Sequence, residues 1–429
     1  MTAPKKGIQR REFLTTSTTA GVAAAAALSH VPFVHAQGSD VLKIGLVGCG
    51  GRGTGAAAQA LKADPNVRLV AMGDAFTDKL RASLANLRND PALAPKIDVP
   101  NERQFTGIDA YTKVIEQCDV VLLTSPPHFR PTHIEAAVRA GKHIFAEKPM
   151  AVDGPGVRRV LAAVEQAKQK KLALVAGFCW RYHKGLRETV KQVHDGKIGN
   201  VVAIQSTYNA SGLWSVERRE GMGDVEWQMR NWLYFTWLSG DFNVEQHIHS
   251  LDKAMWIMRN EPPVKAWGTG GRQVRVDPKF GHIFDHMAVV FEFANGTRCY
   301  SFCRQQDGCK NDVSDIIMGT EGQASLIRHQ VTGRNAWTYR PMGRDVDMYQ
   351  QEHNELFKSI RDGEPKMDGD WMMKSTLMGI MGRMAAYTGQ EVTWQAAMNS
   401  QEDLTPPSYD MTARLPVAPV ARPGATPLR

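Results

Sequence analysis

The sequence lacks a hydrophobic run long enough to cross a bilayer. Its most apolar N-terminal stretch, Gly21 to Leu28, is short and built mainly from alanine, whereas a membrane-spanning helix needs about 20 apolar residues. It also lacks a basic block, because Lys and Arg are interspersed with Asp and Glu and the formal net charge is +8. We therefore expect no stable membrane span and no nucleic-acid partner.

The N-terminus carries the features of an export signal. Arg10 and Arg11 precede the apolar run, and the small-residue site Val34-His35-Ala36 follows it. The arginine pair resembles the twin-arginine signature, which directs export of folded proteins through the twin-arginine machinery. We expect residues 1–36 to be removed and the protein to be periplasmic or otherwise exported. About 390 residues then remain, enough for two domains.

Paired cysteines are also missing. The chain has no CxxC motif, and its six cysteines are dispersed: Cys49, Cys118, Cys179, Cys299, Cys303 and Cys309. A twin-arginine substrate folds in the reducing cytosol, so buried free thiols are favoured, with pairing of Cys303 and Cys309 after export left open.

A glycine-rich turn opens the remaining chain. Leu42 to Val47 has the composition of a strand, and the alanine-rich stretch from Thr54 to Lys62 favours a helix. Between them, Gly48, Gly50 and Gly53 have G-x-G-x-x-G spacing. Glycine permits the tight turn and the close approach of backbone to a pyrophosphate. Strand, turn and helix together predict a dinucleotide site.

The next strand ends in an acid. The stretch "VRLVAMGD" finishes at Asp74, where a carboxylate accepts hydrogen bonds from ribose hydroxyls and repels a 2′-phosphate. Asp74 therefore favours NAD over NADP, with a helix-capping role as the alternative. Further strand and helix patterns continue to residue 178 and predict a doubly wound parallel sheet, a Rossmann domain over residues 40–178.

Polar residues follow two of the later strands, where ligands of such sheets bind. Ser125, Pro126 and His128 follow one strand, and Glu147 and Lys148 follow another. An ammonium near a bound nicotinamide can polarise a substrate hydroxyl or stabilise an alkoxide. Lys148 is thus a candidate catalytic residue, although a lysine just past a strand can also be solvated surface.

Four of these motifs together resemble the Gfo/Idh/MocA family of sugar and inositol oxidoreductases. They are "GLVGCGGRG", "GD" at 73–74, "SPPHFR" at 125–130 and "AEKPMAVD" at 146–153. The resemblance implies that Gly51 and Arg52, which lie in the first of these motifs, also bind the cofactor. The resemblance also implies a second domain built on a large open, mainly antiparallel sheet, which we place at 179–411.

The second half has its own strand pattern. Alternating stretches predict an antiparallel sheet with one face free to meet another subunit, so we expect a homodimer or homotetramer. Residues 412–429, rich in proline and alanine, are predicted to form a flexible tail.

The stretch "VEQHIHSLD" offers ligand types for a metal and groups for acid/base chemistry. Val244, Ile248 and Leu251 fall on one helical stripe, which predicts a buried helix face. At about 100° per residue, Glu245 and His249 share a neighbouring stripe, whereas His247 points away. This geometry favours acid/base work over a metal site, unless the helix start is irregular.

The resembling family carries Asp-x-x-x-His at this helix, with the histidine on the reacting hydroxyl. His249 matches that histidine and Glu245 replaces the aspartate, so Glu245 either contacts a differently seated substrate or orients His249. The alternative is that His249 is a structural histidine in the core, with its hydrogen bonds made inside the protein. We predict no metal.

Aromatic, arginine and amide side chains suit a polyol ring and its hydroxyls. The candidates for contact with a carbohydrate substrate are Arg181, Tyr182, Arg230, Asn231, Trp232 and His286. Tyr182 and Trp232 are the stronger candidates for purely structural roles.

Three functions fit these residues. The first is an NAD-dependent oxidoreductase with tightly held cofactor, in which His249 removes the proton from a secondary hydroxyl of a sugar, glycoside or inositol-like substrate and Lys148 stabilises the alkoxide. The second is glycoside cleavage by transient oxidation and elimination, which some family relatives perform. The third is a non-catalytic sugar-binding protein.

Overall fold

Six parallel strands form the first sheet of the computed structural model, which describes residues 40–429. Their order is β3-β2-β1-β4-β5-β6, so the order reverses between β1 and β4. The strands are β1 (Leu42–Val47), β2 (Val67–Asp74), β3 (Gln104–Thr106), β4 (Val120–Leu123), β5 (His143–Ala146) and β6 (Leu174–Ala176). Ligands of such sheets bind outside the carboxyl ends of the strands at this reversal.

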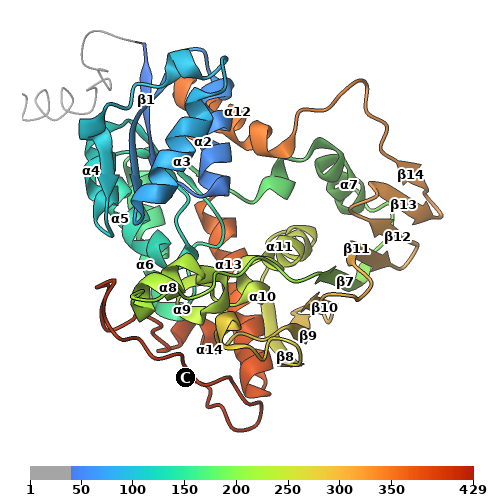
Figure 1. Ribbon diagram of the computed structural model, residues 1–429. Coiled ribbons are helices and arrows are strands. Elements are labelled where there is room, and N and C mark those ends of the chain that lie inside the picture. The colour runs from blue at the N-terminus through green and yellow to red at the C-terminus, as the bar shows by residue number, and fades with distance from the viewer. Residues whose placement is uncertain (1–39) are drawn as a thin grey trace, which may run out of the picture. The chain divides into compact units, whose positions relative to one another are not determined.

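Helices cover both faces of this sheet, which explains why all four residues of β4 are apolar and buried. One face packs against α2 (Gly51–Ala63), α3 (Thr77–Arg88) and α12 (Met348–Arg361). The other face packs against α4 (Ala110–Gln117), α5 (Arg130–Arg139) and α6 (Gly154–Gln169). Figure 1 shows α2, α3, α4 and α5 around β1. The predicted doubly wound sheet is confirmed.

Nine strands form the second sheet, in the order β14-β13-β12-β11-β7-β10-β9-β8-β15. Its β7 and β10 pair in parallel and the other neighbours are antiparallel, which confirms the expected mainly antiparallel sheet. The strands are β7 (Val201–Ala210), β8 (Pro263–Gly271), β9 (His286–Phe293), β10 (Arg298–Gln305), β11 (Asp312–Gly319), β12 (Gly322–Ser325), β13 (Gln330–Gly333), β14 (Trp337–Thr338) and β15 (Val392–Thr393).

Two helices cover one face of the nine-stranded sheet. They are α11 (Ile248–Ile257) and α13 (Gly369–Thr388), which contact β7, β8, β9 and β11 (Figure 1). Along β10 the side chains alternate, so that Cys299, Ser301 and Cys303 are buried beneath these helices while Tyr300 and Phe302 are exposed on the opposite face.

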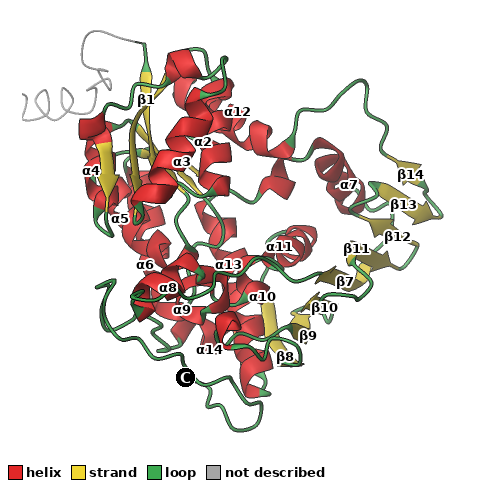
Figure 2. Cartoon of the chain, viewed as in Figure 1, coloured by secondary structure: helices red, strands yellow, loops and turns green. Residues whose placement is uncertain are grey.

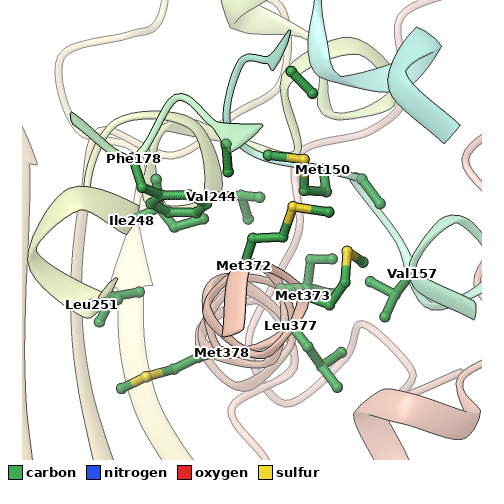
Figure 3. Packing of buried hydrophobic residues seen from close by; sticks show 14 of the residues in the cluster. Met150, Val157, Phe178, Val244, Ile248, Leu251, Met372, Met373, Leu377 and Met378 are labelled. Atoms are coloured by element: carbon green, nitrogen blue, oxygen red, sulfur yellow. The ribbon is translucent and has the colours of Figure 1, made fainter. Parts of the chain in front are cut away.

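The remaining helices are separated by loops (Figure 2) and, in places, by 3₁₀ turns. They are α7 (Lys184–His194), α8 (Asp224–Arg230), α9 (Thr236–Ser239), α10 (Phe242–Glu245) and α14 (Trp394–Asn399). The predicted apolar stripe on α10 and α11 is buried: Val244, Ile248 and Leu251 are fully enclosed and lie beside the methionines of α13 (Figure 3).

The C-terminal segment differs from the expected free tail. Residues 412–429 contain no helix or strand, yet the Asp224 carboxylate accepts from the Leu415 backbone N–H at 3.0 Å, and the Ser400 hydroxyl donates to the Arg429 carbonyl at 2.6 Å. These contacts hold the segment against the second domain.

All six cysteines lie in the described residues and are free thiols. Cys303 is buried, with its sulfur 3.6 Å from the Asn243 side-chain oxygen, whereas Cys309 is exposed, so the suggested disulfide is not formed. Among residues 40–429, no helix has the length and apolar character needed to span a membrane. The predicted export signal, residues 1–36, lies outside the described part of the chain.

Candidate active site

The glycine-rich turn between β1 and α2 is tightly packed on one side and open on the other. A Cβ on Gly48, whose φ is +94°, would lie 2.5 Å from the Ser125 backbone nitrogen, and one on Gly53 would lie 2.0 Å from the Gly48 carbonyl oxygen. A Cβ on Gly50 or Gly51 would meet nothing within 4 Å. The first turn of α2 also has no acidic residue. The open side and the bare helix N-terminus suit a pyrophosphate.

Asp74 ends β2 beside this turn. Its carboxylate accepts a hydrogen bond from the Cys49 N–H at 2.6 Å and another from the Phe76 N–H at 2.8 Å, which fixes its orientation. Burial raises the pKa of Asp74 above its ordinary value. A carboxylate at this position of a doubly wound sheet recognises ribose hydroxyls, so Asp74 fits the adenosine half of NAD.

A cavity of about 710 Å³ extends from this turn to α10 and α11. It is lined by all but one of the predicted cofactor-binding residues: Gly48, Gly50, Gly51, Arg52, Gly53, Asp74, Ser125, Pro126, Glu147 and Lys148. Glu245 and His249 line the same cavity. The structure therefore brings the three candidate catalytic side chains and the glycine-rich turn to one cavity.

His128 is the exception and does not line the cavity. The chain makes a single 3₁₀ turn after β4, so that the His128 ring faces Trp237 and its Nε2 lies 2.7 Å from the Tyr409 hydroxyl. His133, at the start of α5, lines the cavity instead and stacks on Tyr111 at 4.3 Å between ring centroids. Sequence proximity to Ser125 and Pro126 was misleading here.

Arg52 links the glycine-rich turn to two carboxylates. Its guanidinium pairs with Glu147 and, at 3.1 Å, with Glu352 on α12. Burial raises the pKa of Glu352 well above its ordinary value, and the negative charge of Glu147 adds to this. Glu147 also accepts from the Lys148 backbone N–H at 3.2 Å. The network fixes the backbone from which Lys148 projects. No sequence pattern pointed to Glu352, which is 205 residues downstream of Glu147.

Lys148 reaches from β5 to α10. Its ammonium donates to the Glu245 carboxylate at 2.7 Å and also to the Glu245 main-chain carbonyl. Both side chains are mostly buried, with 11% and 18% of their surface exposed. The sequence left Glu245 either on the substrate or orienting His249. The structure shows a third relationship, in which Glu245 holds Lys148.

His247 and His249 diverge, as the helical geometry predicted. The expected single helix is two helices, because the His247 N–H bonds to the Phe242 carbonyl five residues back and widens the turn between α10 and α11. His247 is fully buried, with its Nε2 2.7 Å from the Ser301 hydroxyl of β10. His249 remains on the cavity with its Nδ1 unpaired among the described residues.

The pKa of His249 lies well below its usual range. Burial is the main cause, and the positive charges of Lys148 and Lys253 act in the same direction. The imidazole is therefore neutral near pH 7 and able to accept a proton. Within residues 40–429, no group of three or more His, Cys, Asp or Glu side chains is arranged to hold a metal ion.

Two of the six predicted substrate-binding residues, Arg230 and Trp232, line the cavity. Arg181 and Tyr182 do not. Arg181 pairs with Asp252 at 2.8 Å and lies between two tryptophan rings, and Tyr182 donates to Asp368 at 2.5 Å. Their polar atoms are occupied by partners inside the protein, which explains why residue type alone misled the prediction.

Asn231 and His286 also lie away from the cavity. The Asn231 amide accepts from the Val216 N–H at 2.9 Å and donates to the Lys279 carbonyl, so it fixes a loop. His286 begins β9, where Met287, Val289 and Phe291 are buried, so strand alternation turns His286 to the opposite face. Its Nδ1 lies 2.7 Å from Asp285.

Sequence reasoning missed several residues that line the cavity. Trp214, Val216 and Met229 line the cavity from the segment that precedes Arg230, and Phe76 lines it two residues after Asp74. The position of Phe76 next to the ribose-binding acid was a usable signal. The loop before α8 has no periodicity that could have placed Trp214.

Comparison with known proteins identifies both halves of the chain. Residues 42–178 match the family model described as an oxidoreductase family with an NAD-binding Rossmann fold. Residues 186–325 match the GFO/IDH/MocA C-terminal domain. The first domain is therefore an NAD-binding Rossmann domain, in agreement with the glycine cradle and Asp74.

Several whole-length relatives are similar. An inositol 2-dehydrogenase of Cereibacter sphaeroides is 32% identical over 344 residues, 77% of this chain and 89% of the relative. The inositol 2-dehydrogenase of Rhizobium meliloti is 28% identical over 334 residues, covering 75% and 89% of the two chains.

Solved structures share the fold. Scyllo-inositol dehydrogenase from Lactobacillus casei with bound NAD(H) and scyllo-inositol aligns with a TM-score of 0.62 at 19% identity, covering 83% of this chain and 100% of that one. Aldose-aldose oxidoreductase from Caulobacter crescentus aligns with a TM-score of 0.63 at 20% identity, covering 82% and 99%. On the matching domains and relatives, the chain belongs to the Gfo/Idh/MocA family of NAD-binding oxidoreductases.

Proposed function

We propose that this protein oxidises a secondary hydroxyl of a cyclic polyol, sugar or glycoside and passes the hydride to NAD. The observation that carries the proposal is the position of Lys148 and His249 on the same cavity as the glycine-rich turn. The inositol 2-dehydrogenases among the relatives support a polyhydroxylated ring as substrate. NAD, when bound, supplies the hydride acceptor.

Two side chains divide the proton chemistry. His249 accepts the hydroxyl proton, because the lowered pKa keeps its imidazole neutral. Lys148 faces the developing alkoxide with an ammonium group that Glu245 holds in place at 2.7 Å. Glu245 is a positioning residue in this account, and its extra methylene relative to aspartate lets the carboxylate reach Lys148.

We also propose tightly held cofactor and export. Nicotinamide coenzymes are made in the cytosol, so an exported enzyme would carry NAD with it and regenerate it in place. Turnover would then be redox-neutral or would use a second substrate. The support for export is the twin-arginine signature in residues 1–36.

The open face of the nine-stranded sheet supports a homodimer or homotetramer. Tyr300 and Phe302 expose 37% and 39% of their surface there. Apolar side chains gathered on one sheet face favour burial against another subunit. Sedimentation of the purified protein tests this, and a monomer at all concentrations would contradict it.

The function is tested by purifying the exported protein, identifying the nucleotide that comes with it, and mixing it with inositols, sugars and glycosides. We expect a single-turnover change in nicotinamide absorbance with a subset of the panel. Lys148→Ala and His249→Ala should abolish it. A glycoside cleaved with no net oxidation would instead identify the elimination route, and unchanged cellular function in both variants would identify a non-catalytic binding protein.

A further inference from the structure

One contact beside the cavity joins the second domain to the first. Arg230 is the last residue of α8 in the second domain, and it lines the cavity. Its guanidinium contacts residues of the first domain. It reaches Asp78 in the first turn of α3 and lies over the ring of Phe76. We call Arg230, Asp78 and Phe76 the interdomain clasp.

The geometry of the clasp uses most of the arginine. The two terminal nitrogens donate to the two Asp78 oxygens at 3.1 and 3.2 Å, and Nε donates to Glu226 at 2.8 Å. The guanidinium carbon lies 3.9 Å from the centroid of the Phe76 ring. Only 17% of the arginine side chain is exposed. A planar guanidinium that pairs with carboxylates through both its terminal nitrogens and its Nε, and that also stacks on an aromatic ring, is held in one orientation.

The clasp stands beside the residue that recognises the ribose. Phe76 follows Asp74 by two residues, and its N–H donates to the Asp74 carboxylate at 2.8 Å. Phe76 and Asp74 both line the cavity. The Arg230–Phe76 stack therefore lies next to the space that the adenosine half of NAD occupies in the proposed function.

We propose that the clasp retains the cofactor, because the adenosine half of NAD can leave only when Arg230 separates from Asp78 and Phe76. This inference rests on the proposed function and adds a residue-level reason for tightly held NAD. It also reassigns Arg230, which the sequence suggested as a substrate contact, to the cofactor. Arg230 acts through the closure of the site and so is a positioning residue.

The chemistry of the clasp predicts a salt dependence. Asp78 is 61% exposed, so salt screens its attraction to Arg230, while the stacking on Phe76 is much less affected. Dissociation of NADH from the wild-type protein should accelerate with ionic strength. Dissociation from a variant without the arginine should be faster at low salt and less sensitive to salt.

The test compares variants by stopped-flow displacement of bound NADH with excess NAD. Arg230→Ala should raise the dissociation rate about tenfold, since an ion pair and a cation–π contact together contribute about that factor. Asp78→Asn should give a smaller increase and lose the salt dependence. Arg230→Lys, which keeps the charge without the planar fork, should lie between wild type and Arg230→Ala.

Arg218→Ala is the matched control. Arg218 lies on the same segment, pairs with Asp224 at 2.6 Å and stacks on Trp227, but these contacts stay within the second domain. Its dissociation rate should stay within about twofold of wild type, because a contact inside one domain does not gate the cavity. Thermal unfolding of each nucleotide-free variant checks that the fold is intact.

Equal NADH dissociation rates in wild type, Arg230→Ala and Arg218→Ala would overturn the clasp. An equal acceleration in Arg230→Ala and Arg218→Ala would also overturn it, because loosening of the segment would then be the cause. Wild-type protein that purifies without nucleotide would contradict tight cofactor in the proposed function. In that case, the ratio of the NADH dissociation constants of Arg230→Ala and wild type would still decide whether the clasp retains the cofactor.

Discussion

The Lys148 ammonium donates to the Glu245 carboxylate at 2.7 Å and also to the Glu245 main-chain carbonyl. This contact joins the end of β5 in the NAD-binding domain to α10 in the second domain. A cation held by a neighbouring carboxylate has few orientations, and such fixed charges are what stabilise a developing alkoxide. The orientation of Lys148 thus depends on Glu245.

The length of Glu245 is therefore expected to matter. Glu245→Asp shortens the side chain by one methylene and withdraws the carboxylate from Lys148, so the single-turnover rate of hydride transfer should fall about tenfold or more. Glu245→Gln keeps the length and should retain more activity than Glu245→Asp. Rates equal to wild type in both variants would remove Glu245 from the site.

The activity should persist at acidic pH. A histidine with an ordinary pKa is protonated below about pH 6.5 and then cannot accept a proton. Because the pKa of His249 is lowered, the acid limb of kcat/KM should lie clearly below pH 6.5. A pH–rate profile of the wild-type protein tests this, and an acid limb at the ordinary histidine pKa would count against His249 as the base.

His247 should influence stability rather than catalysis. Burial lowers its pKa to about 3, so below the unfolded value of about 6.5 the unfolded chain takes up a proton that the folded chain does not. Above pH 6.5, this proton uptake by the unfolded chain makes no contribution to stability. As pH falls from 6.5 toward 3, it lowers the free energy of unfolding by about 1.4 kcal/mol per pH unit. In urea unfolding, His247→Gln should reduce this pH dependence by that amount. An identical slope in both proteins would contradict the burial.

The glycine-rich turn offers a matched pair of variants. Gly53→Ala places a Cβ 2.0 Å from the Gly48 carbonyl oxygen and should lower the free energy of unfolding by about 1–3 kcal/mol. Gly51→Ala meets no atom within 4 Å, so stability should change little. Its methyl group would enter the space assigned to the pyrophosphate and weaken NAD binding about tenfold or more. Unchanged NAD affinity in Gly51→Ala would place the pyrophosphate elsewhere.

Cofactor choice should depend on Asp74. Asp74→Ser removes the carboxylate that repels a 2′-phosphate, and the nearby Lys79, which lines the same cavity, can then attract one. The ratio of kcat/KM for NADP to that for NAD should rise at least about tenfold. An unchanged ratio would favour the capping role for Asp74.

The fold and the candidate site were predicted best where a local sequence pattern and a functional motif coincide. The strands around Gly48 and Asp74 were readable because a strand, a glycine turn and an acid follow one another in fixed spacing. The divergence of His247 and His249 followed from helical geometry even though the helix is broken at Gln246 and His247. Periodicity survives one widened turn, since the apolar stripe must still face the core.

The sequence could not show which polar side chains were already satisfied. Arg181 and Tyr182 have the residue types of a sugar site, but Asp252 and Asp368, more than 70 residues away, occupy them. The prediction for His286 failed because strand alternation turns its side chain away from the buried face, and the side it takes depends on where β9 begins. The clasp of Arg230 with Asp78 depends on how the two domains meet, and no local pattern encodes that.

We propose that hydride passes from a ring carbon of the substrate to NAD in the cavity that contains Lys148 and His249. The most direct measurement uses an accepted inositol or glycoside deuterated at its carbinol carbons and follows the label by NMR. With no second substrate present, we expect deuterium in the nicotinamide ring after a single oxidative half-reaction of the wild-type protein and none with Lys148→Ala. Oxidised product formed by the wild-type protein without deuterium in the nicotinamide would contradict the account.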